Sequence, residues 1–189
     1  MEIIIEPLKL LIKTLREKGE EFASVIKMGR TGLQDAVPIT LGQQLNAFAS
    51  GMERALARIE YEQSHWNHSC LGGTAVGTGM GCLPGFRGKV NKHLSDVLGY
   101  EVKAYDDVVD GMMAIDDLIA CHGQVVALSA QVWKLARDLR VMASGPNSGL
   151  REVYFEVKNP ENALNPQRFA SCSLESVITA CNQVSANNS

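Results

Sequence analysis

The stretch Lys27-Met-Gly-Arg-Thr-Gly-Leu-Gln-Asp-Ala-Val-Pro-Ile-Thr-Leu-Gly-Gln43 separates two segments that both carry helical periodicity. Apolar residues before it recur at helical spacing and predict a first helix that ends at Gly29. These residues are Ile4, Leu8, Leu11, Leu15, Phe22, Val25 and Ile26. We expect a loop between Gly29 and Pro38, because Pro38 suits the first turn of a second helix.

The second helix carries the clearest apolar pattern of the chain. Its apolar residues follow one another at spacings of four and three: Leu41, Leu45, Phe48, Met52, Ala55 and Ile59. This pattern predicts a seam like that of a coiled coil. The glycine-rich stretch 71–88 predicts a loop, and we expect a short helix over residues 89–98.

Two further helices are predicted in the second half of the chain. The third begins near Asp106 and Asp107, since acidic residues are favourable at a helix N-terminus, and ends at Ser144-Gly145-Pro146. Its apolar stripe is Leu118, Val125, Leu128, Val132, Leu135, Leu139 and Met142. Residues 147–171 lack periodicity, and a fourth helix starts near Leu174. The sequence therefore predicts an all-α fold of long helices. Such rods cannot bury themselves in a compact monomer, which favours a bundle shared between subunits.

Composition limits the classes of partner. The 189 residues have a formal net charge of −3, which gives no electrostatic footprint for nucleic acid. No apolar run approaches the roughly 20 residues that span a bilayer. The five cysteines are an odd number without CxxC pairs, which favours reduced thiols. We therefore expect a cytoplasmic protein, with a mitochondrial location left open.

Several residues suggest chemistry only weakly. The glycines of residues 72–79 lack the Lys-Ser/Thr pair of a phosphate-binding loop, which argues against nucleotide binding. His65, His68 and Cys70 lack a fourth metal ligand at fixed spacing, so the two histidines are interpreted as partly exposed helix residues. We expect His122 to be packed or hydrogen-bonded. On these grounds no cofactor and no metal are predicted.

Three motifs give the chain a family resemblance. Lys27–Gln43, Leu71–Gly79 and Ala143–Leu150 resemble, in order and at family spacing, three segments of the fumarase/aspartase superfamily. The resemblance implies that residues 1–189 form the central helical-bundle domain of that fold, without the family's N-terminal and C-terminal domains. It also implies a bundle completed by oligomerisation, with a tetramer as the expected state. The acidic pair 106–107 together with His122-Gly123 tilts the resemblance slightly towards aspartase.

The resemblance implies an activity and a set of site residues. Members of the family eliminate water or ammonia from a dicarboxylate to give fumarate. Thr31, Gly32 and Gln34 match substrate-binding positions in the family's loop-to-helix segment, although Gly32 replaces the usual histidine or glutamine. A structural interpretation of Thr31 remains open as well, since its segment also shapes the turn and caps the second helix.

The family's signature loop is degenerate within residues 147–171. Without a gap, Asn162 takes the position of the base serine, Arg168 that of the lysine and Ala170 that of the asparagine. An amide has no usable basicity, and Arg168 keeps its charge with a different geometry. We expect a homologue impaired when alone, acting as an assembly or vestigial subunit, either with copies of itself or mixed with a full-length paralogous lyase. A subunit or fragment of an active aspartate ammonia-lyase or fumarate hydratase, and a truncated product without a role, are the alternatives.

Overall fold

The structure is a computed structural model that describes residues 2–145, 147–155 and 171–188. Its elements in chain order are α1 Glu2–Glu21, β1 Ile26–Thr31, β2 Gln34–Thr40, α2 Leu41–His65, β3 His68–Ser69, α3 Phe86–Leu98, β4 Lys103–Ala104, α4 Val108–Met113, α5 Asp116–Met142 and α6 Ser171–Ala186. The chain forms two compact units, which are described separately. The bundle unit comprises residues 1–58 and 123–189, and the glycine-loop unit comprises residues 59–122.

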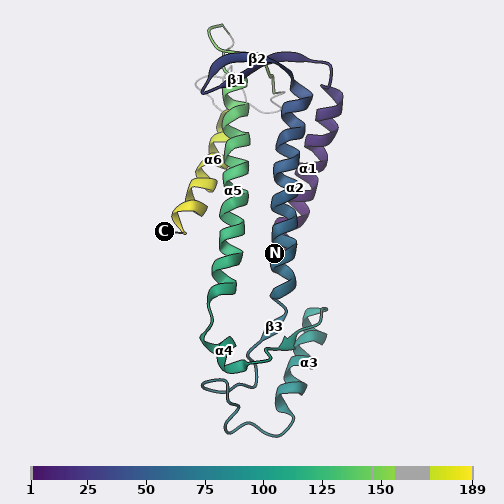
Figure 1. Cartoon of the computed structure of the whole chain (residues 1–189), viewed down its shortest axis with the longest axis vertical. Helices are drawn as coiled ribbons and strands as arrows, with labels where there is room; N and C mark the ends of the chain where they lie inside the picture. The colour runs from purple at the N-terminus through teal and green to yellow at the C-terminus, as the bar shows by residue number, and fades with distance from the viewer. Residues whose placement is uncertain (1, 146, 156–170, 189) are drawn as a thin grey trace. The chain divides into compact units, whose positions relative to one another are not determined.

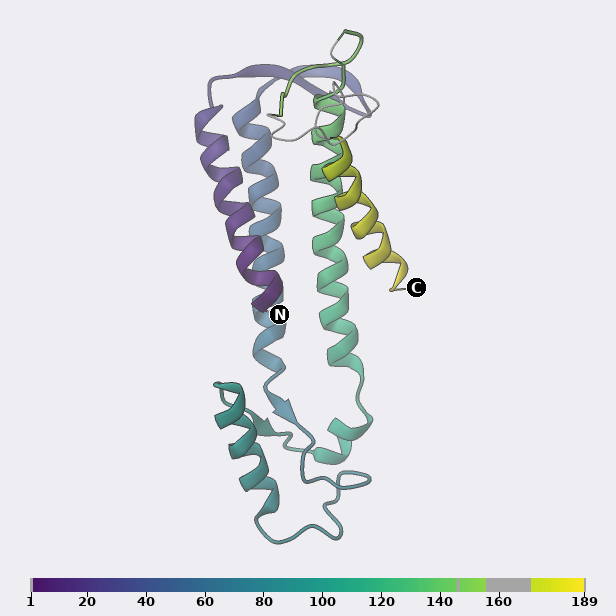
Figure 2. The ribbon, with the colours of Figure 1, turned by 180° about the vertical axis from the view of Figure 1, so that it is seen from behind.

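Long helices dominate the bundle unit. α1 lies beside α2 and α6 lies beside α5, and the chain reverses direction from each helix to the next (Figures 1 and 2). The hairpin formed by β1 and β2 lies at one end, next to the C-terminal end of α5. The prediction of a long-helix bundle is thus confirmed, with small β elements added to it.

The predicted seam of α2 is buried; its residues from Leu41 to Ala55 belong to the core of the bundle unit, and Ile59 belongs to the glycine-loop unit. All six of its residues are buried, from Leu41 to Ile59, and Met52 and Ile59 are completely inaccessible. α5 contributes a second buried row made by Leu128, Leu135 and Met142, one residue every seven. Spacings of seven keep one face of a helix turned towards its neighbour. Leu118 does not follow the predicted stripe, because it is exposed at 59%.

Small residues bring α1 and α2 close together. A side chain on Gly42 would collide with the backbone of Gly19 and Ala23, and one on Gly19 would collide with Asn46. Arg16 then joins the two helices through hydrogen bonds to Asn46, Ser50 and Glu53. The hydrogen bond to Glu53 raises the pKa of Arg16 and lowers that of Glu53. These contacts set the direction in which α2 leaves the hairpin.

The loop predicted between the first two helices is wrong. α1 ends at Glu21, and residues 26–40 form an antiparallel hairpin. β-Branched Val25 and Ile26 favour extended backbone, and Ile26 is 76% exposed. Pro38 lies in β2 opposite Met28, which a two-stranded ribbon tolerates because one edge of each strand needs no donor. The apolar pattern had carried the predicted first helix through Ile26 to Gly29.

The predicted third helix is divided in two. Asp107 caps α4, its carboxylate accepting from the backbone N–H groups of Val109 and Asp110. The predicted start near Asp107 is therefore confirmed, but α4 ends at Met113 and Ala114 is extended. Asp116 and Asp117 then stand in the first turn of α5, where acidic residues favour a new helix. The predicted short helix begins earlier, at Phe86, and the predicted fourth helix begins at residue 171.

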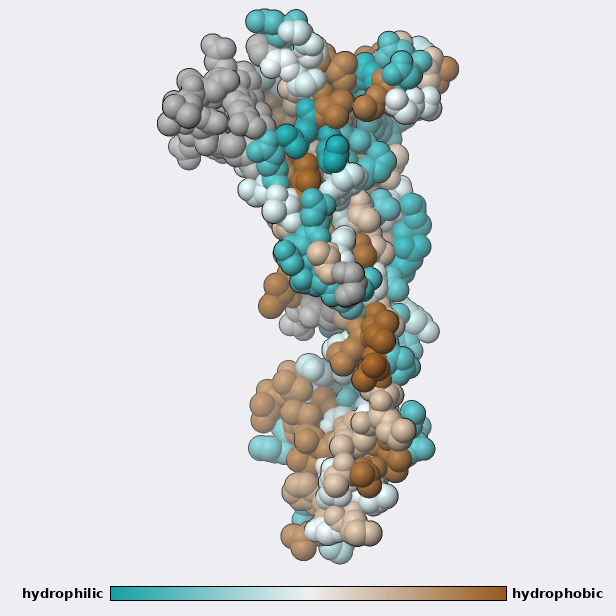
Figure 3. All heavy atoms as spheres, turned by 90° about the vertical axis from the view of Figure 1, so that its left-hand side faces the viewer, coloured by the Kyte–Doolittle hydropathy of each residue, from teal (hydrophilic) through white to brown (hydrophobic). Residues whose placement is uncertain are grey.

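The glycine-loop unit contains α3, α4 and the two-stranded parallel pair β3–β4. Its loop packs closely against the start of α4 at Gly73 and Gly77, because side chains there would collide with Val108 and Val109. Asn91 of α3 is buried and donates to the carbonyl groups of Leu71 and Arg87. Hydrophobic side chains gather on its surface in Figure 3. The most exposed large hydrophobic side chains among the described residues of this unit are those of Met80, Leu83, Val97 and Met113.

Candidate functional site at the hairpin

The hairpin turn places the predicted substrate-binding residues together. Thr31 pairs with Gln34 across a two-residue turn, and Gly32 and Leu33 both have positive φ, 56° and 64°. Two positive φ values are the property of the turn that suits the twist of a β-hairpin. Thr31, Gly32 and Gln34 are all exposed. Apart from its chain neighbours, no described residue has an atom within 4 Å of the place where a side chain on Gly32 would begin. Among the described residues, nothing therefore crowds the position where the resembling family carries histidine or glutamine.

Thr40, rather than Thr31, caps α2. The Thr40 hydroxyl accepts from the backbone N–H of Gln43 at 3.0 Å, and the Gln43 side chain accepts from the backbone N–H of Thr40 at 2.9 Å. This reciprocal pair is a capping box. The signal was present in the sequence as Thr-x-x-Gln before an apolar run, and sequence reasoning missed it. Thr31 is the last residue of β1, at the turn end of the hairpin and away from α2, and is not involved in the cap.

A carboxylate fixes the hairpin to the chain that follows α5. Glu152 Oε1 accepts from Arg30 Nη1 at 2.7 Å, and Glu152 Oε2 lies 3.2 Å from Lys27 Nζ. The Lys27 contact is an ion pair without hydrogen-bond geometry, because Oε2 has no hydrogen-bond partner within the described residues. Asp35 is a second partner of Arg30, at 3.1 Å from its Nε. The hydrogen bond to Glu152 is the main reason why the pKa of Arg30 is raised. Sequence reasoning did not find Glu152.

The chain returns tightly on itself after α5. Glu152 N–H donates to the carbonyl of Met142, Arg151 N–H donates to that of Ser144, and Leu150 N–H donates to the Ser144 hydroxyl. A side chain on Gly149 would collide with the Ser144 backbone, so the return requires glycine there. The Ala143–Leu150 motif thereby brings residue 152 back to the end of α5, where it meets the hairpin.

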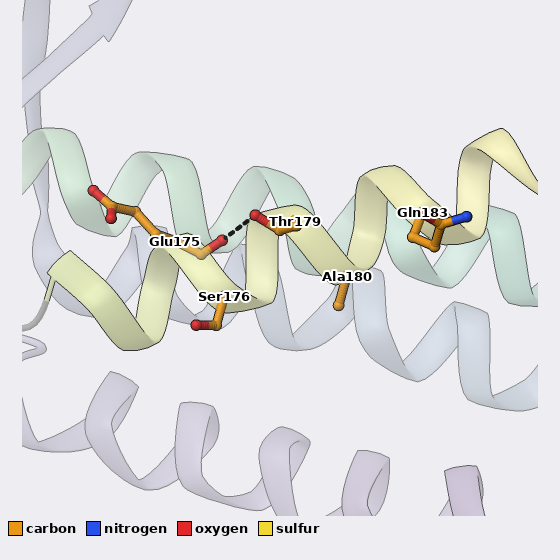
Figure 4. A pocket seen from close by; sticks show the side chains of 5 residues that line it. All are labelled: Glu175, Ser176, Thr179, Ala180 and Gln183. Carbon is orange, nitrogen blue, oxygen red and sulfur yellow. Dashed lines mark hydrogen bonds between the residues drawn. The ribbon is translucent and has the colours of Figure 1, made fainter.

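The predicted catalytic positions Asn162, Arg168 and Ala170 lie outside the described residues. The described element that follows them in the sequence is α6, where Glu175, Ser176, Thr179, Ala180 and Gln183 line a shallow surface hollow of about 600 Å³ (Figure 4). Arg140 of α5 donates to Glu175 at 2.8 Å and so joins α5 to α6. Arg137 lies over the Trp133 ring at 4.7 Å.

The histidines that the sequence offered as weaker candidates lie in the glycine-loop unit. His65 and His68 are exposed, and each has its Nδ1 near a carbonyl of the α2 C-terminal turn. Within the described ranges, no three histidine, cysteine or acidic side chains are grouped as metal ligands. His122 is half-buried, and its Nε2 has no hydrogen-bond partner in the part of the chain that the structure describes.

Comparison with known proteins identifies the family. The sequence profile of the family described as "Lyase" matches residues 1–185. Fumarate hydratase class II of Staphylococcus aureus (strain MRSA252) is 35% identical over 189 residues, which are 100% of this chain and 41% of that protein. The enzyme of the same name from Thermosynechococcus vestitus is 35% identical over 187 residues, 99% of this chain and 40% of that protein.

Solved structures give the same result. The class II fumarase of Schistosoma mansoni superposes with a TM-score of 0.91 at 29% identity, covering 97% of this chain and 42% of that one. A fumarate lyase:delta crystallin from Brucella melitensis bound to cobalt gives 0.89 at 37% identity, covering 96% and 39%.

The long-helix bundle and its hairpin are therefore those of a lyase, and the chain belongs to this family, within the fumarase/aspartase superfamily. The relatives just described by sequence are class II fumarate hydratases, and they lend no support to the slight preference for aspartase. The chain spans about 40% of the length of these relatives and corresponds to their central helical domain. No helix in the described ranges is both long and apolar enough to cross a membrane.

Proposed function

We propose that the chain is a bundle-forming subunit of class II fumarase type, which assembles with copies of itself or with a full-length lyase and is catalytically impaired alone. The observation that carries this proposal is the composition of α5. From Leu118 to Trp133 the helix contains no charged residue. A soluble helix without a polar face is normally buried on all sides.

In the bundle unit, which holds residues 123–142 of α5, the described residues cover only part of the helix surface. Leu128 and Leu135 are buried, whereas Val125, Val132 and Trp133 remain partly accessible. A second bundle would remove this apolar surface from water, which is the usual driving force for a permanent subunit interface. A homotetramer is the state we propose, in line with the family resemblance. Residues 1–189 would then act as one central bundle domain, in the cytoplasm.

The substituted positions support impaired catalysis. Asn162 replaces the serine that would remove a proton, and Arg168 and Ala170 replace the lysine and asparagine that would hold a carboxylate. A general base typically contributes about 10² to 10⁴ in rate. Gly32 removes a further side chain from the hairpin. Residues 147–171 would thus be a degenerate signature loop.

A second candidate function is that the chain is a subunit or fragment of a working fumarate hydratase or aspartate ammonia-lyase. The identity of 35% to class II fumarate hydratases favours the first of these enzymes. Thr31 and Gln34 are retained at an exposed and structurally defined turn, where a dicarboxylate could be bound. In this alternative, other subunits supply the missing groups of a shared site.

A turnover assay separates the two candidates. The purified chain is tested for fumarate hydration and aspartate deamination, alone and mixed with a full-length class II fumarase that lacks its base serine. We expect less than about 0.1 turnovers per second for the chain alone, well below ordinary enzymes. A second arm uses a repaired chain that carries Asn162→Ser, Ala163→Ser, Asn165→Met, Arg168→Lys and Ala170→Asn.

The repaired chain is expected to remain inactive alone and to gain activity only in the mixture. Turnover by the unaltered chain alone would contradict the proposed impairment and favour the second candidate. Mixed oligomers that form and stay inactive with the repaired chain would show that these positions do not lie at a shared site.

A further inference from the structure

Glu152 lies between two cations and is largely removed from water. The side chains of Glu152, Arg30 and Lys27 are only 16%, 19% and 8% exposed. Each oxygen of the carboxylate faces a different cation, at 2.7 Å from Arg30 Nη1 and 3.2 Å from Lys27 Nζ. Ion pairs that are shielded from solvent depend strongly on both partners being present, since an unpaired buried charge is costly.

The hairpin contains a β-bulge between Lys27 and Arg30, the two cations that contact Glu152. The strand register shifts between Met28 and Arg30, where Ala36 and Val37 together lie opposite Gly29. Side chains three residues apart on a regular strand point to opposite faces. The extra residue of this β-bulge lies in β2, opposite Gly29 of β1, and the long side chains of Lys27 and Arg30 both reach Glu152. Bulges commonly redirect side chains next to functional sites.

The charges of the two cations are already matched by two carboxylates. Lys27 Nζ donates to the carbonyl of Met28 at 3.0 Å in addition to its ion pair with Glu152. Arg30 is divided between Glu152 and Asp35. Two positive and two negative charges balance one another here. This cluster is therefore suited to holding the hairpin, not to binding a dicarboxylate.

The ion pair that holds Arg30 lies next to the candidate substrate ligand Thr31. Arg30 immediately precedes Thr31, which pairs with Gln34 at the turn. We infer that Glu152 is a positioning residue, which with Lys27 and Arg30 fixes the hairpin carrying Thr31 and Gln34 to the end of α5. This inference rests on the proposed function, in that an assembled lyase site would use the hairpin.

The first experiment measures hydrogen exchange in the full chain, with Glu152→Gln as the test variant. Asp35→Asn is the matched control, because it removes the charge of the other carboxylate partner of Arg30. The side chain of Asp35 is 71% exposed. We expect Glu152→Gln to speed amide exchange in residues 26–40 by about tenfold or more, while exchange in the middle of α2 is unchanged. Asp35→Asn should leave both regions as they are. Lys27→Arg, which keeps the charge, should also preserve the protection.

The second experiment reads the position of Thr31 through kinetics. The chain with Gly32→His is mixed with Staphylococcus aureus fumarate hydratase whose own counterpart of Thr31 is alanine, so that turnover requires the hairpin of this chain. We expect Glu152→Gln to raise the KM for fumarate by about tenfold with a smaller change in kcat, as for a lost ground-state contact. A purely structural role would lower the amount of active oligomer without changing KM.

The outcomes separate the two proposals. If Glu152→Gln changes neither hairpin exchange nor KM, the positioning role is overturned. If the mixture is inactive even with Glu152 intact, the shared site of the proposed function fails, and hydrogen exchange alone decides whether Glu152 positions the hairpin. Should Glu152→Gln unfold the chain, the double variant Lys27→Met with Glu152→Gln is used, because it leaves no buried lysine without a carboxylate.

Discussion

Tyr105 shows how one residue of the glycine-loop unit is held by its surroundings. Its ring lies over Gly111, where a side chain would come within 2.7 Å of the ring, and the His68 ring is 5.3 Å away. Its hydroxyl donates to Asp117 Oδ2 at 3.0 Å. Burial, followed by this hydrogen bond to a carboxylate, raises the pKa of Tyr105 to about 12. The phenol is therefore bound as a neutral donor.

This shift predicts a loss of stability at alkaline pH. The folded state holds the phenol proton more tightly than the unfolded chain, whose tyrosine pKa is about 10. The contribution is fully present below about pH 10 and is lost as the pH rises towards 12. We expect Tyr105→Phe to flatten the pH dependence of unfolding in this window and to remove one step from the tyrosinate absorbance titration. Tyr100→Phe, at an exposed position, is the control; equal effects of the two changes would contradict the assignment.

At the scale of elements, glycines on α2 and α5 have opposite roles. Gly42 allows α1 to approach α2, and a side chain there would come within 2.7 Å of Ala23 Cα. Gly123 lies inside α5, and outside the helix's own backbone no described residue comes within 4 Å of the place of its would-be side chain. We expect Gly42→Ala to destabilise the chain by about 1 to 3 kcal/mol through overpacking. Gly123→Ala should stabilise it by about 0.5 to 1 kcal/mol, the usual helical preference for alanine. Denaturant unfolding measures both, and two changes of the same sign would refute the packing argument.

The sequence predicted elements where one periodicity runs uninterrupted. The seam from Leu41 to Ile59 is buried as expected, because a repeat of four and three leaves little choice of face. The hairpin was missed because its bulge and the Gly32–Leu33 turn break the alternation that identifies strands. Thr31, Gly32 and Gln34 were grouped correctly by their motif. Glu152 carries no local signal, since only the folded chain brings it to Arg30.

At the scale of the whole molecule, two variants of α5 distinguish folding from assembly. Leu128 is 8% exposed, and a carboxylate there would lack any partner. Leu128→Asp is expected to destabilise the chain by roughly 3 kcal/mol or more and to reduce helicity. Ala130 is exposed on the same helix, within the uncharged stretch that we propose to be covered by another subunit. Ala130→Asp should therefore keep the helicity, because no core contact is lost, and lower the oligomer mass, because it places a charge in the proposed interface. Circular dichroism and light scattering measure the two quantities. A stable monomer of the unaltered chain would contradict the proposed assembly.

The contact between Arg30 and Glu152 also has a consequence for the order of folding. It joins residues 122 positions apart, whereas the hairpin and the capping box of α2 close within the first part of the chain. Contacts between distant residues are slow to form, because the chain between them must first lose its conformational freedom. During synthesis, α1, the hairpin and α2 leave the ribosome well before residue 152. The turn that presents Thr31 is therefore complete early, but it is locked in place only after α5 has been made.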